Sequence, residues 1–301
     1  MNFMRQLIIT AFLLIPAPPL CAGGTEGAAP FNFLFLDANA RPAAMGGAYA
    51  AAANDANALL YNPAGLAGMK QNHATFQHTG HFQGVTQEYG AVALKQGLGF
   101  MFNTVGYGKL QRTTISNPRG TGLGDFGIRD WVVSAGYGKS CKDGLLNFGM
   151  AGKYINEEID TFKAQAVALD LGAILDLKSQ GLPLLMGVAV QNIGTKAKFQ
   201  SSYEDLPVNF KAGLAYRFLN SGLLVLDANL PKNGSATVHA GGEYVVFEKL
   251  ALRIGYNGRN ETGSGITVGG GVRINRFSVD YAFVPFGTLG DSHKIGLSCY
   301  W

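Results

Sequence analysis

From about Val85 to the end of the chain, apolar residues occupy every second position of short segments that are separated by Gly, Asn, Asp, Ser or Pro. Successive side chains of a β-strand point to opposite faces, so a period of two predicts strands with one apolar face and one polar or small face. In the last segment, Ile295 and Leu297 share the apolar face, and Lys294 lies on the other. The alternation therefore restricts the fold to the all-β class, with a soluble sandwich and a membrane barrel as the alternatives.

The alternating segments number about fourteen. Strands that cross a membrane need about 9 to 11 residues each, so fourteen of them account for about 126 to 154 residues. The rest of the 301 residues must form loops and a further element. The candidate strands cover approximately residues 73–82, 88–96, 98–109, 125–138, 145–156, 164–177, 183–193, 207–219, 222–230, 236–247, 249–257, 264–274, 275–285 and 291–301.

The composition points to a membrane. Only 15% of the residues are charged and 47% are hydrophobic, whereas soluble domains carry about 25% charged residues. So apolar a chain would aggregate in water unless it buried that surface. A membrane helix needs a run of about 18 to 25 apolar residues, and the one long apolar stretch, residues 7–20, is interrupted by prolines. Strands rather than helices are therefore expected to cross the membrane.

Residues 1–22 are predicted to be a secretory signal peptide. Arg5 precedes the apolar stretch, which ends in the sequence LCAGG at residues 20–24, a suitable site for cleavage after Ala22. A single amino-terminal anchor is the alternative. The large residues before Cys21 argue against a lipid-modified cysteine.

Three features favour the membrane barrel over the sandwich. The signal peptide directs export, and the small and charged residues share one strand face, as a polar barrel interior requires. The chain also ends on Trp301, which resembles the terminal signal by which bacterial outer-membrane barrels are recognised during assembly. Residues 71–301 are therefore predicted to form an antiparallel transmembrane β-barrel of about fourteen strands in the bacterial outer membrane. Membrane lipid and the barrel-assembly machinery are its expected partners.

Residues 23–70 differ from the rest of the chain. They are rich in Ala and Gly and do not alternate, and residues 43–52 read AAMGGAYAAA. So many small residues do not suit a helix that faces lipid. This segment is predicted to form a hatch of short helical turns inside the barrel.

Several motifs resemble those of the PorV/PorQ family of outer-membrane proteins. The longest is at the amino-terminal side, where residues 36–48 read LDANARPAAMGGA and residues 58–67 read ALLYNPAGLA. Later matches are ALDLG at 168–172, VQNIGTK at 190–196 and LPVNFKAGLAYRF at 206–218. Together they span most of the chain that follows the signal peptide.

The PorV/PorQ family is similar in turn to the FadL-type transporters of hydrophobic compounds. That resemblance implies a fourteen-stranded barrel plugged by an amino-terminal hatch, and passage of small hydrophobic molecules as the function. Asn62, Pro63 and Ala64 correspond to an Asn-Pro-Ala motif of the hatch, followed by Gly65. Pro63 restricts Asn62 to an extended conformation and Gly65 permits close approach. These residues are candidates for a moving gate, with a static sharp turn as the alternative.

The PorV resemblance also implies an alternative function. In type IX secretion such a barrel is an accessory that holds secreted protein cargo for attachment at the cell surface. The expected partner is thus either a hydrophobic small molecule or a secreted protein.

Ionisable residues on the small-residue face are expected to line the lumen. Unpaired charge in a narrow space is costly, so these side chains should pair across strands, and a lining that guides substrate is the other interpretation. The candidates are Lys153, Asp170, Glu243, Arg253, Arg273 and Asp280.

The sequence contains no complete motif for an enzyme, a metal site or nucleic-acid binding. The run from Gly136 to Ser140 ends like a phosphate-binding loop, which would need glycine at Val133, and no Gly-x-Ser-x-Gly elbow occurs. His73, His78 and His81 lie near one another in sequence, but on a strand His78 points away from the other two. The 24 basic residues form no run. We therefore expect no enzyme activity, cofactor, metal or nucleic-acid partner.

Overall fold

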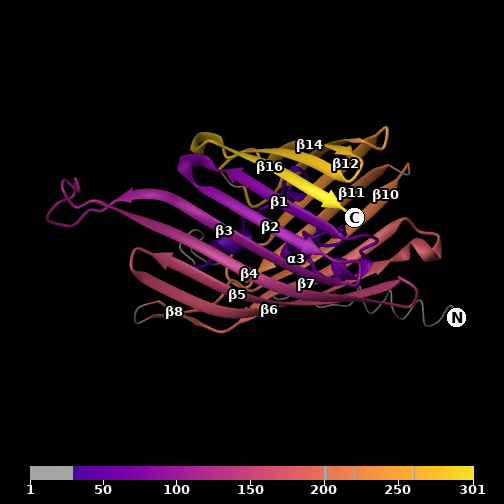
Figure 1. The fold of residues 1–301 in the computed structure, drawn as a ribbon, viewed down its shortest axis with the longest axis horizontal. Helices are drawn as coiled ribbons and strands as arrows, with labels where there is room; N and C mark the ends of the chain where they lie inside the picture. The colour runs from indigo at the N-terminus through magenta and orange to yellow at the C-terminus, as the bar shows by residue number, and fades with distance from the viewer. Residues whose placement is uncertain (1–29, 200–201, 220, 261) are drawn as a thin grey trace.

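The computed structural model describes residues 30–199, 202–219, 221–260 and 262–301. In this part of the chain, fourteen antiparallel strands close into a barrel, and the first strand pairs with the last (Figure 1). This confirms the predicted fold class. The barrel strands are β1 (His73–Gly80), β2 (Thr86–Ala93), β3 (Leu98–Gln111), β4 (Asp125–Cys141), β5 (Leu146–Ile159), β6 (Phe162–Asp176), β7 (Leu184–Gly194), β10 (Asn209–Phe218), β11 (Gly222–Pro231), β12 (Thr237–Val246), β13 (Leu250–Asn257), β14 (Ile266–Ile274), β15 (Phe277–Pro285) and β16 (Asp291–Tyr300).

Two short strands lie outside the barrel and were not predicted. β8 (Ala197–Phe199) and β9 (Ser202–Glu204) pair with each other in the loop that joins β7 to β10. Three residues are too few to show a period of two, so the sequence pattern could not predict this hairpin.

The predicted signal peptide, residues 1–22, lies outside the described residues.

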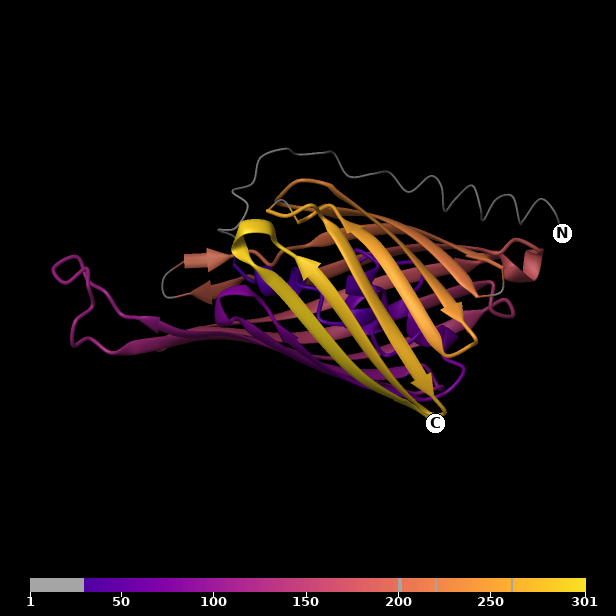
Figure 2. The same cartoon turned by 90° about the horizontal axis from the view of Figure 1, so that it is seen from above.

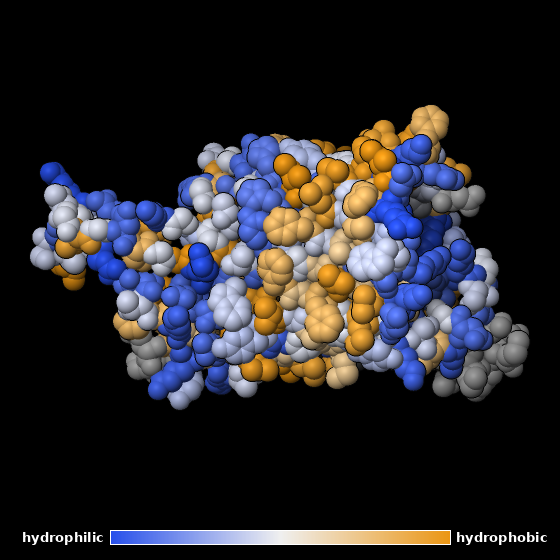
Figure 3. All heavy atoms as spheres, in the orientation of Figure 1, coloured by the Kyte–Doolittle hydropathy of each residue, from blue (hydrophilic) through white to orange (hydrophobic). Residues whose placement is uncertain are grey.

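The alternation in sequence separates the two faces of the barrel wall. On β13, Leu252 and Ile254 are exposed on the outer face, whereas Ala251 and Arg253 face the lumen and are buried. Figure 3 shows the exposed apolar side chains gathered over the middle of the visible face, with hydrophilic residues towards both ends. A lipid-facing zone bounded by polar ends is the surface that a transmembrane barrel requires.

An arginine in this zone should be costly. We expect Leu252→Arg to lower the free energy of unfolding by about 2–4 kcal/mol, because the charge would lie at the level of the hydrocarbon. Leu250→Arg, at the first residue of β13, should cost at most about 1 kcal/mol because it lies near the interface. Urea titration of the barrel folded in lipid vesicles measures both. Equal losses for the two variants would contradict a lipid-facing zone at Leu252.

The two ends of the barrel differ. At one end, here called the short-turn end, the connections are short, such as residues 94–97, 142–145 and 247–249. At the other, the long-loop end, residues 112–124 and 195–208 connect the strands. Strands β3 to β6 have 14 to 17 residues, whereas β10 to β16 have 8 to 10. The long strands therefore extend beyond the rest of the wall, and the β3–β4 hairpin projects farthest (Figures 1 and 2).

The described residues before β1 lie inside the barrel (Figure 2). They form short helical turns, as predicted for the hatch: η1 (Asn32–Phe35), α2 (Ala40–Ala44), α3 (Ala58–Tyr61) and η2 (Pro63–Gly68). The Asn39 side chain caps α2 by accepting a hydrogen bond from the backbone N–H of Arg41. No helix among the described residues is long and apolar enough to cross a membrane.

Glycines on the lumen face of the strands let the hatch backbone touch the wall. A Cβ atom at Gly149 would overlap the backbone of Pro63, and one at Gly255 would overlap the backbone of Met45 and Gly46. Backbone contact leaves no room for side chains at these positions. The 42 glycines of the chain are thus explained in part by close packing between hatch and wall.

Candidate functional site

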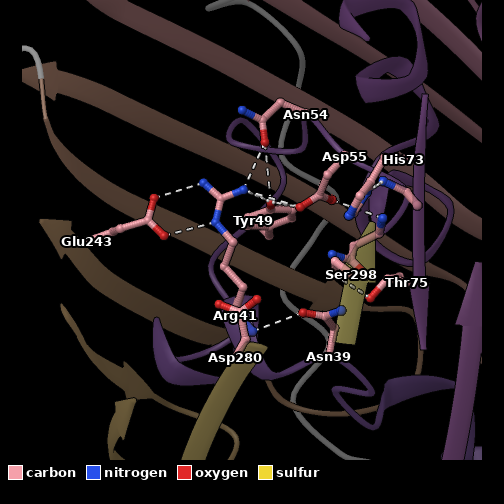
Figure 4. A network of polar contacts seen from close by, with 12 residues as sticks. Asn39, Arg41, Tyr49, Asn54, Asp55, His73, Thr75, Glu243, Asp280 and Ser298 are labelled. Atoms are coloured by element: carbon pink, nitrogen blue, oxygen red, sulfur yellow. Dashed lines mark hydrogen bonds and ion pairs between the residues drawn. The ribbon is translucent and has the colours of Figure 1, made fainter. Parts of the chain in front are cut away.

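A buried ionic network joins the hatch to the wall. Arg41 of α2 makes a bidentate pair with Glu243 of β12, through Nε and Nη2 at 3.0 and 2.9 Å (Figure 4). Arg253 of β13 donates to the same carboxylate at 2.7 Å and to Asp280 of β15 at 2.6 Å. Glu243 and Arg253 lie on adjacent strands, and Arg253 reaches Asp280 across Gly271 of β14, so strand pairing brings three of the predicted lumen residues together.

On the hatch side, Arg41 is held by residues of its own segment. Its Nη1 donates to the hydroxyl of Tyr49 at 2.7 Å, to Asn54 at 3.0 Å and to Asp55 at 3.2 Å (Figure 4). The Tyr49 hydroxyl also donates to Asp55 at 2.8 Å. Since one guanidinium satisfies acceptors on both the hatch and the wall, this network resists displacement of α2.

Asp227 of β11 is a second anchor, and the sequence analysis missed it. Its Oδ2 accepts the backbone N–H groups of Tyr49 and Ala50, each at 2.7 Å. The alternation of β11 carries the signal that could have identified it, because Val225, Asp227 and Asn229 share the buried face. Its partners could not have been predicted, because the two N–H groups belong to an irregular segment of the hatch.

Asn62 is fully buried and fixes the hatch to strands β6 and β7. Its Nδ2 donates to the carbonyl of Ala50 in the hatch at 2.7 Å. The same Nδ2 donates to two carbonyls of the wall, that of Val188 on β7 at 3.2 Å and that of Ala173 on β6 at 3.3 Å. Its Oδ1 accepts the N–H of Ala64 at 3.1 Å, which caps η2. Pro63 follows as the first residue of η2, where its missing N–H is not needed.

Lys153 and Asp170 form a separate pair on β5 and β6. Their charged atoms lie 2.6 Å apart, and both side chains are buried. Asn192 of β7 completes the group: its amide oxygen accepts from Lys153 at 2.9 Å, and its N–H donates to Asp170 at 2.8 Å. Asn192 has a φ of 62° at an irregularity in the β6–β7 pairing, a conformation that Asn tolerates. The motifs at 168–172 and 190–196 therefore meet here.

Arg273 and Trp301 lie outside these buried groups, although Arg273 lines the same cavity as Glu243, Arg253 and Asp280. Arg273 is exposed at the short-turn end, with its guanidinium 4.2 Å from the centre of the Tyr300 ring. It therefore differs from the other five predicted lumen residues, which are buried. Trp301 is half exposed and pairs through its backbone with Asn72, which closes the chain end onto the start of β1.

A cavity of about 540 Å³ opens at the short-turn end, beneath the hatch. Its lining includes the hatch residues Arg41, Asp55 and Gly65 and the wall residues Glu243 and Asp280. The ionic network thus forms part of the charged surface of this vestibule.

The lumen on the other side of the hatch has an apolar wall. Val132, Ile155 and Ala166 lie opposite one another in register across β4, β5 and β6, and all three are buried. The next row towards the long loops pairs Asp130 with Glu157, flanked by Val105 and Ala164. Across β4 to β6 this part of the wall is therefore apolar apart from two carboxylates, whereas β2 and β3 add the buried amides of Gln87 and Asn103 beside Val105 and Val132.

The three neighbouring histidines do not converge. His73 accepts the N–H of Ala56 and stacks on Tyr300, whereas His78 lies on the exposed face 2.6 Å from Glu88. His81 follows β1 and bonds Ser292 at 2.8 Å. Each imidazole therefore has different partners, and the described residues contain no group of three side chains that could hold a metal ion.

His81 should make the long-loop end sensitive to acid. Burial, reinforced by the nearby ammonium of Lys294, lowers the pKa of His81 to about 4, below the value near 6.5 of an unfolded chain. The stability that its neutral form contributes is complete above about pH 6.5 and is lost as the pH falls to about 4. His81→Gln should therefore lose less stability than the wild type between pH 7 and 4, as measured by urea unfolding. An equal loss in both proteins would contradict this assignment.

Comparison with known proteins identifies the fold. No protein-family model matches the chain, and no curated protein matches it. The chain is similar in structure to the toluene transporter TodX of Pseudomonas putida, with a TM-score of 0.56 and 13% identity over 87% of this chain and 96% of that chain. A TodX deltaS2S3 mutant, described as a monoaromatic hydrocarbon channel, gives 0.54 and 15% identity over 86% and 97%.

Identities this low show a shared architecture only. The closed barrel of this chain is the fold that these two solved structures share, and their own descriptions name a transporter and a channel. The PorV/PorQ resemblance gains no support from these comparisons.

Proposed function

We propose that this protein is a channel of the PorV/PorQ type through which small hydrophobic molecules cross the bacterial outer membrane. The apolar lumen wall formed by Val132, Ile155 and Ala166 carries the proposal. Water-filled barrels have polar interiors, so an apolar lumen wall is suited to an apolar solute. The structural similarity to the toluene transporter TodX supports the same class of solute.

The protein has an expected orientation and route to the membrane. Residues 1–22 would direct export, and Trp301 would be read by the barrel-assembly machinery. Outer-membrane barrels place short turns in the periplasm and longer loops outside. The vestibule beneath the hatch would then face the periplasm, with residues 23–70 as the hatch and residues 71–301 as the barrel.

Asn62, Pro63, Ala64 and Gly65 are proposed to be a fixed anchor of the hatch rather than a moving gate. The hydrogen bonds of Asn62 to carbonyls of two wall strands support this role. The charged lumen residues would likewise be structural, since Glu243, Arg253 and Asp280 satisfy one another and hold Arg41.

Uptake of N-phenyl-1-naphthylamine by cells tests the channel. This uncharged dye fluoresces in the inner part of the envelope and is excluded by an intact outer membrane. Cells that display the wild-type barrel should take it up several-fold faster than cells without it. Ile155→Asp should abolish the gain, and Ile155→Val should retain it. Equal uptake with and without a correctly folded barrel would refute the proposal.

The role as an accessory of type IX secretion rests on the sequence resemblance alone. A host genome that lacks type IX components would exclude it.

A further inference from the structure

A groove in the outer surface of the barrel follows the seam where the last strand pairs with the first. Its volume is about 660 Å³, and it lies over β15, β16, β1, β2 and β3. Four of these strands, β16 and β1 to β3, lie on the visible face of Figure 1, and Figure 3 shows apolar side chains over the middle of this face. The groove therefore belongs to the lipid-facing zone of the wall.

The strand register explains why the surface is hollow here. In the row of outward-facing residues nearest the short-turn end, small side chains lie between large ones. Across the five strands this row reads Phe277, Cys299, Ala74, Val92 and Phe100. The two small residues at the centre form the floor, and the exposed phenyl rings at either end form the walls.

The groove is a depression in the surface and not a hole in the wall. The pairing of β15 with β16, of β16 with β1, of β1 with β2 and of β2 with β3 runs without a register shift behind it. On the lumen side, the hydroxyls of Ser298 and Thr75 bond to each other across the seam at 2.9 Å. A molecule must therefore enter the groove from the membrane.

The groove lies next to a basic end of the barrel. Positively charged side chains at the short-turn end outnumber the negatively charged ones. The cations are Lys70, Lys95, Lys139, Lys142, Lys178, Arg217, Lys249, Arg273 and Arg276, and the carboxylates are Asp143, Asp176 and Glu248. Basic residues gathered at a membrane surface attract the headgroups of anionic lipids.

Two of these cations flank the groove. Arg276 immediately precedes Phe277, and its carbonyl accepts the N–H of Tyr300 at 2.8 Å. On the other side of the seam, the N–H of Lys95 donates to the side chain of Asn72 at 3.0 Å. Both cations are exposed, and neither forms an ion pair within the described part of the chain.

The chain end lies between these two cations. Trp301 pairs through its backbone with Asn72, and its side chain is half exposed. Its carboxylate offsets one positive charge, and the guanidinium of Arg273, which stacks on the ring of Tyr300, supplies another. The mouth of the groove therefore combines excess positive charge with an indole, a side chain that is typical of the level of lipid headgroups.

We propose that the groove is the seat of one anionic phospholipid in the leaflet that borders the short-turn end. One acyl chain lies on the floor formed by Cys299 and Ala74, and Lys95 and Arg276 bind the phosphate. The groove contacts the chain of any phospholipid, whereas the two cations favour a headgroup with a net negative charge. This inference does not depend on what crosses the lumen, so it stands or falls separately from the proposed channel.

Native mass spectrometry of the full barrel, released from detergent micelles, tests the headgroup. Dioleoylphosphatidylglycerol should bind at least about ten-fold more tightly than dioleoylphosphatidylcholine. Lys95→Gln and Arg276→Gln should each weaken binding of phosphatidylglycerol about five-fold, the effect of one basic residue at a membrane surface, and leave phosphatidylcholine unaffected. Lys178→Gln, which removes a cation of the same end beyond β6, is the control and should change neither affinity.

Filling the groove tests the seat of the acyl chain. Ala74→Phe combined with Cys299→Phe should weaken binding of both lipids at least about ten-fold, because contact with about two methylene groups is lost. The matched control is Ala212→Phe with Ala228→Phe, which enlarges another pair of small residues that oppose each other in register, on β10 and β11. This control should retain the affinity of the wild type for both lipids.

Three results would overturn the proposal. Equal affinity of the wild type for the two phospholipids would refute the headgroup assignment. Undiminished binding to the filled groove would mean a diffuse attraction to the basic end without a seat for the chain. A dimer that disappears when the groove is filled would identify the occupant as a second copy of the chain. The glutamine variants alter exposed positions, so they keep the test decisive even if the filled variant fails to fold.

Discussion

Replacement of Arg253 by methionine is expected to lower the free energy of unfolding of the barrel by about 3–5 kcal/mol, the usual cost of removing one partner from a buried ion pair. Arg253 is the cation between Glu243 and Asp280, at 2.7 and 2.6 Å. Methionine fills a similar volume but leaves Asp280 without that cation. Urea unfolding of the barrel in lipid vesicles, followed by its altered mobility on electrophoresis, measures the loss.

Two further variants separate charge from packing. Arg276→Met removes an exposed arginine from a short turn, and we expect a change below about 0.5 kcal/mol. Adding Asp280→Asn to Arg253→Met should restore part of the lost stability, because the uncompensated charge is removed. No recovery in the double variant would mean that lost packing, not the buried carboxylate, accounts for the effect.

Asn62→Asp is expected to release the hatch. The substitution keeps the shape of the side chain but replaces the Nδ2 donor by an acceptor that faces the carbonyls of Ala50, Val188 and Ala173. A buried acceptor opposite carbonyl oxygens loses these hydrogen bonds and gains repulsion, so we expect a cost of about 3 kcal/mol or more. Hydrogen exchange should therefore rise sharply in residues 58–68, while the barrel strands stay protected.

A matched control lies in the same hatch. Asn54 is exposed and its Oδ1 accepts from Arg41, so Asn54→Asp keeps that acceptor and should leave exchange in residues 58–68 unchanged. If Asn62→Asp also left hydrogen exchange in residues 58–68 unchanged, Asn62 would not anchor the hatch, and the alternative of a moving gate would regain support.

The barrel could be predicted because its signal is local. Each predicted strand has an observed counterpart among β1 to β7 and β10 to β16, with ends that differ by a few residues. Thr86, for example, begins β2 two residues before the predicted start, because pairing with β1 and β3 extends the strand into a stretch with weaker alternation. The hatch was predicted from its small residues and from the absence of alternation.

The contacts of the candidate site could be predicted from the sequence only in part. Placing Lys153 and Asp170 on the lumen face followed from the alternation, but their pairing at 2.6 Å depends on the register between β5 and β6. Asp227 has the same alternation signal and was missed, because its importance arises from two backbone N–H groups of the hatch. Arg273 shares the predicted face, but it lies one residue from the end of β14 and is exposed.

The sequence alone determined which side chains face lipid and which face the lumen, because successive side chains of a strand point in opposite directions whatever the strand pairs with. It also determined that a segment rich in small residues must be enclosed. Only the tertiary structure decided which lumen residues meet, because the barrel brings together strands and hatch segments that are far apart in sequence, as with Arg41 and Glu243, which are 202 residues apart. The same closure decided that Phe31 and Phe33 fill the apolar lumen, since the wall that buries them comes from strands β3 to β6.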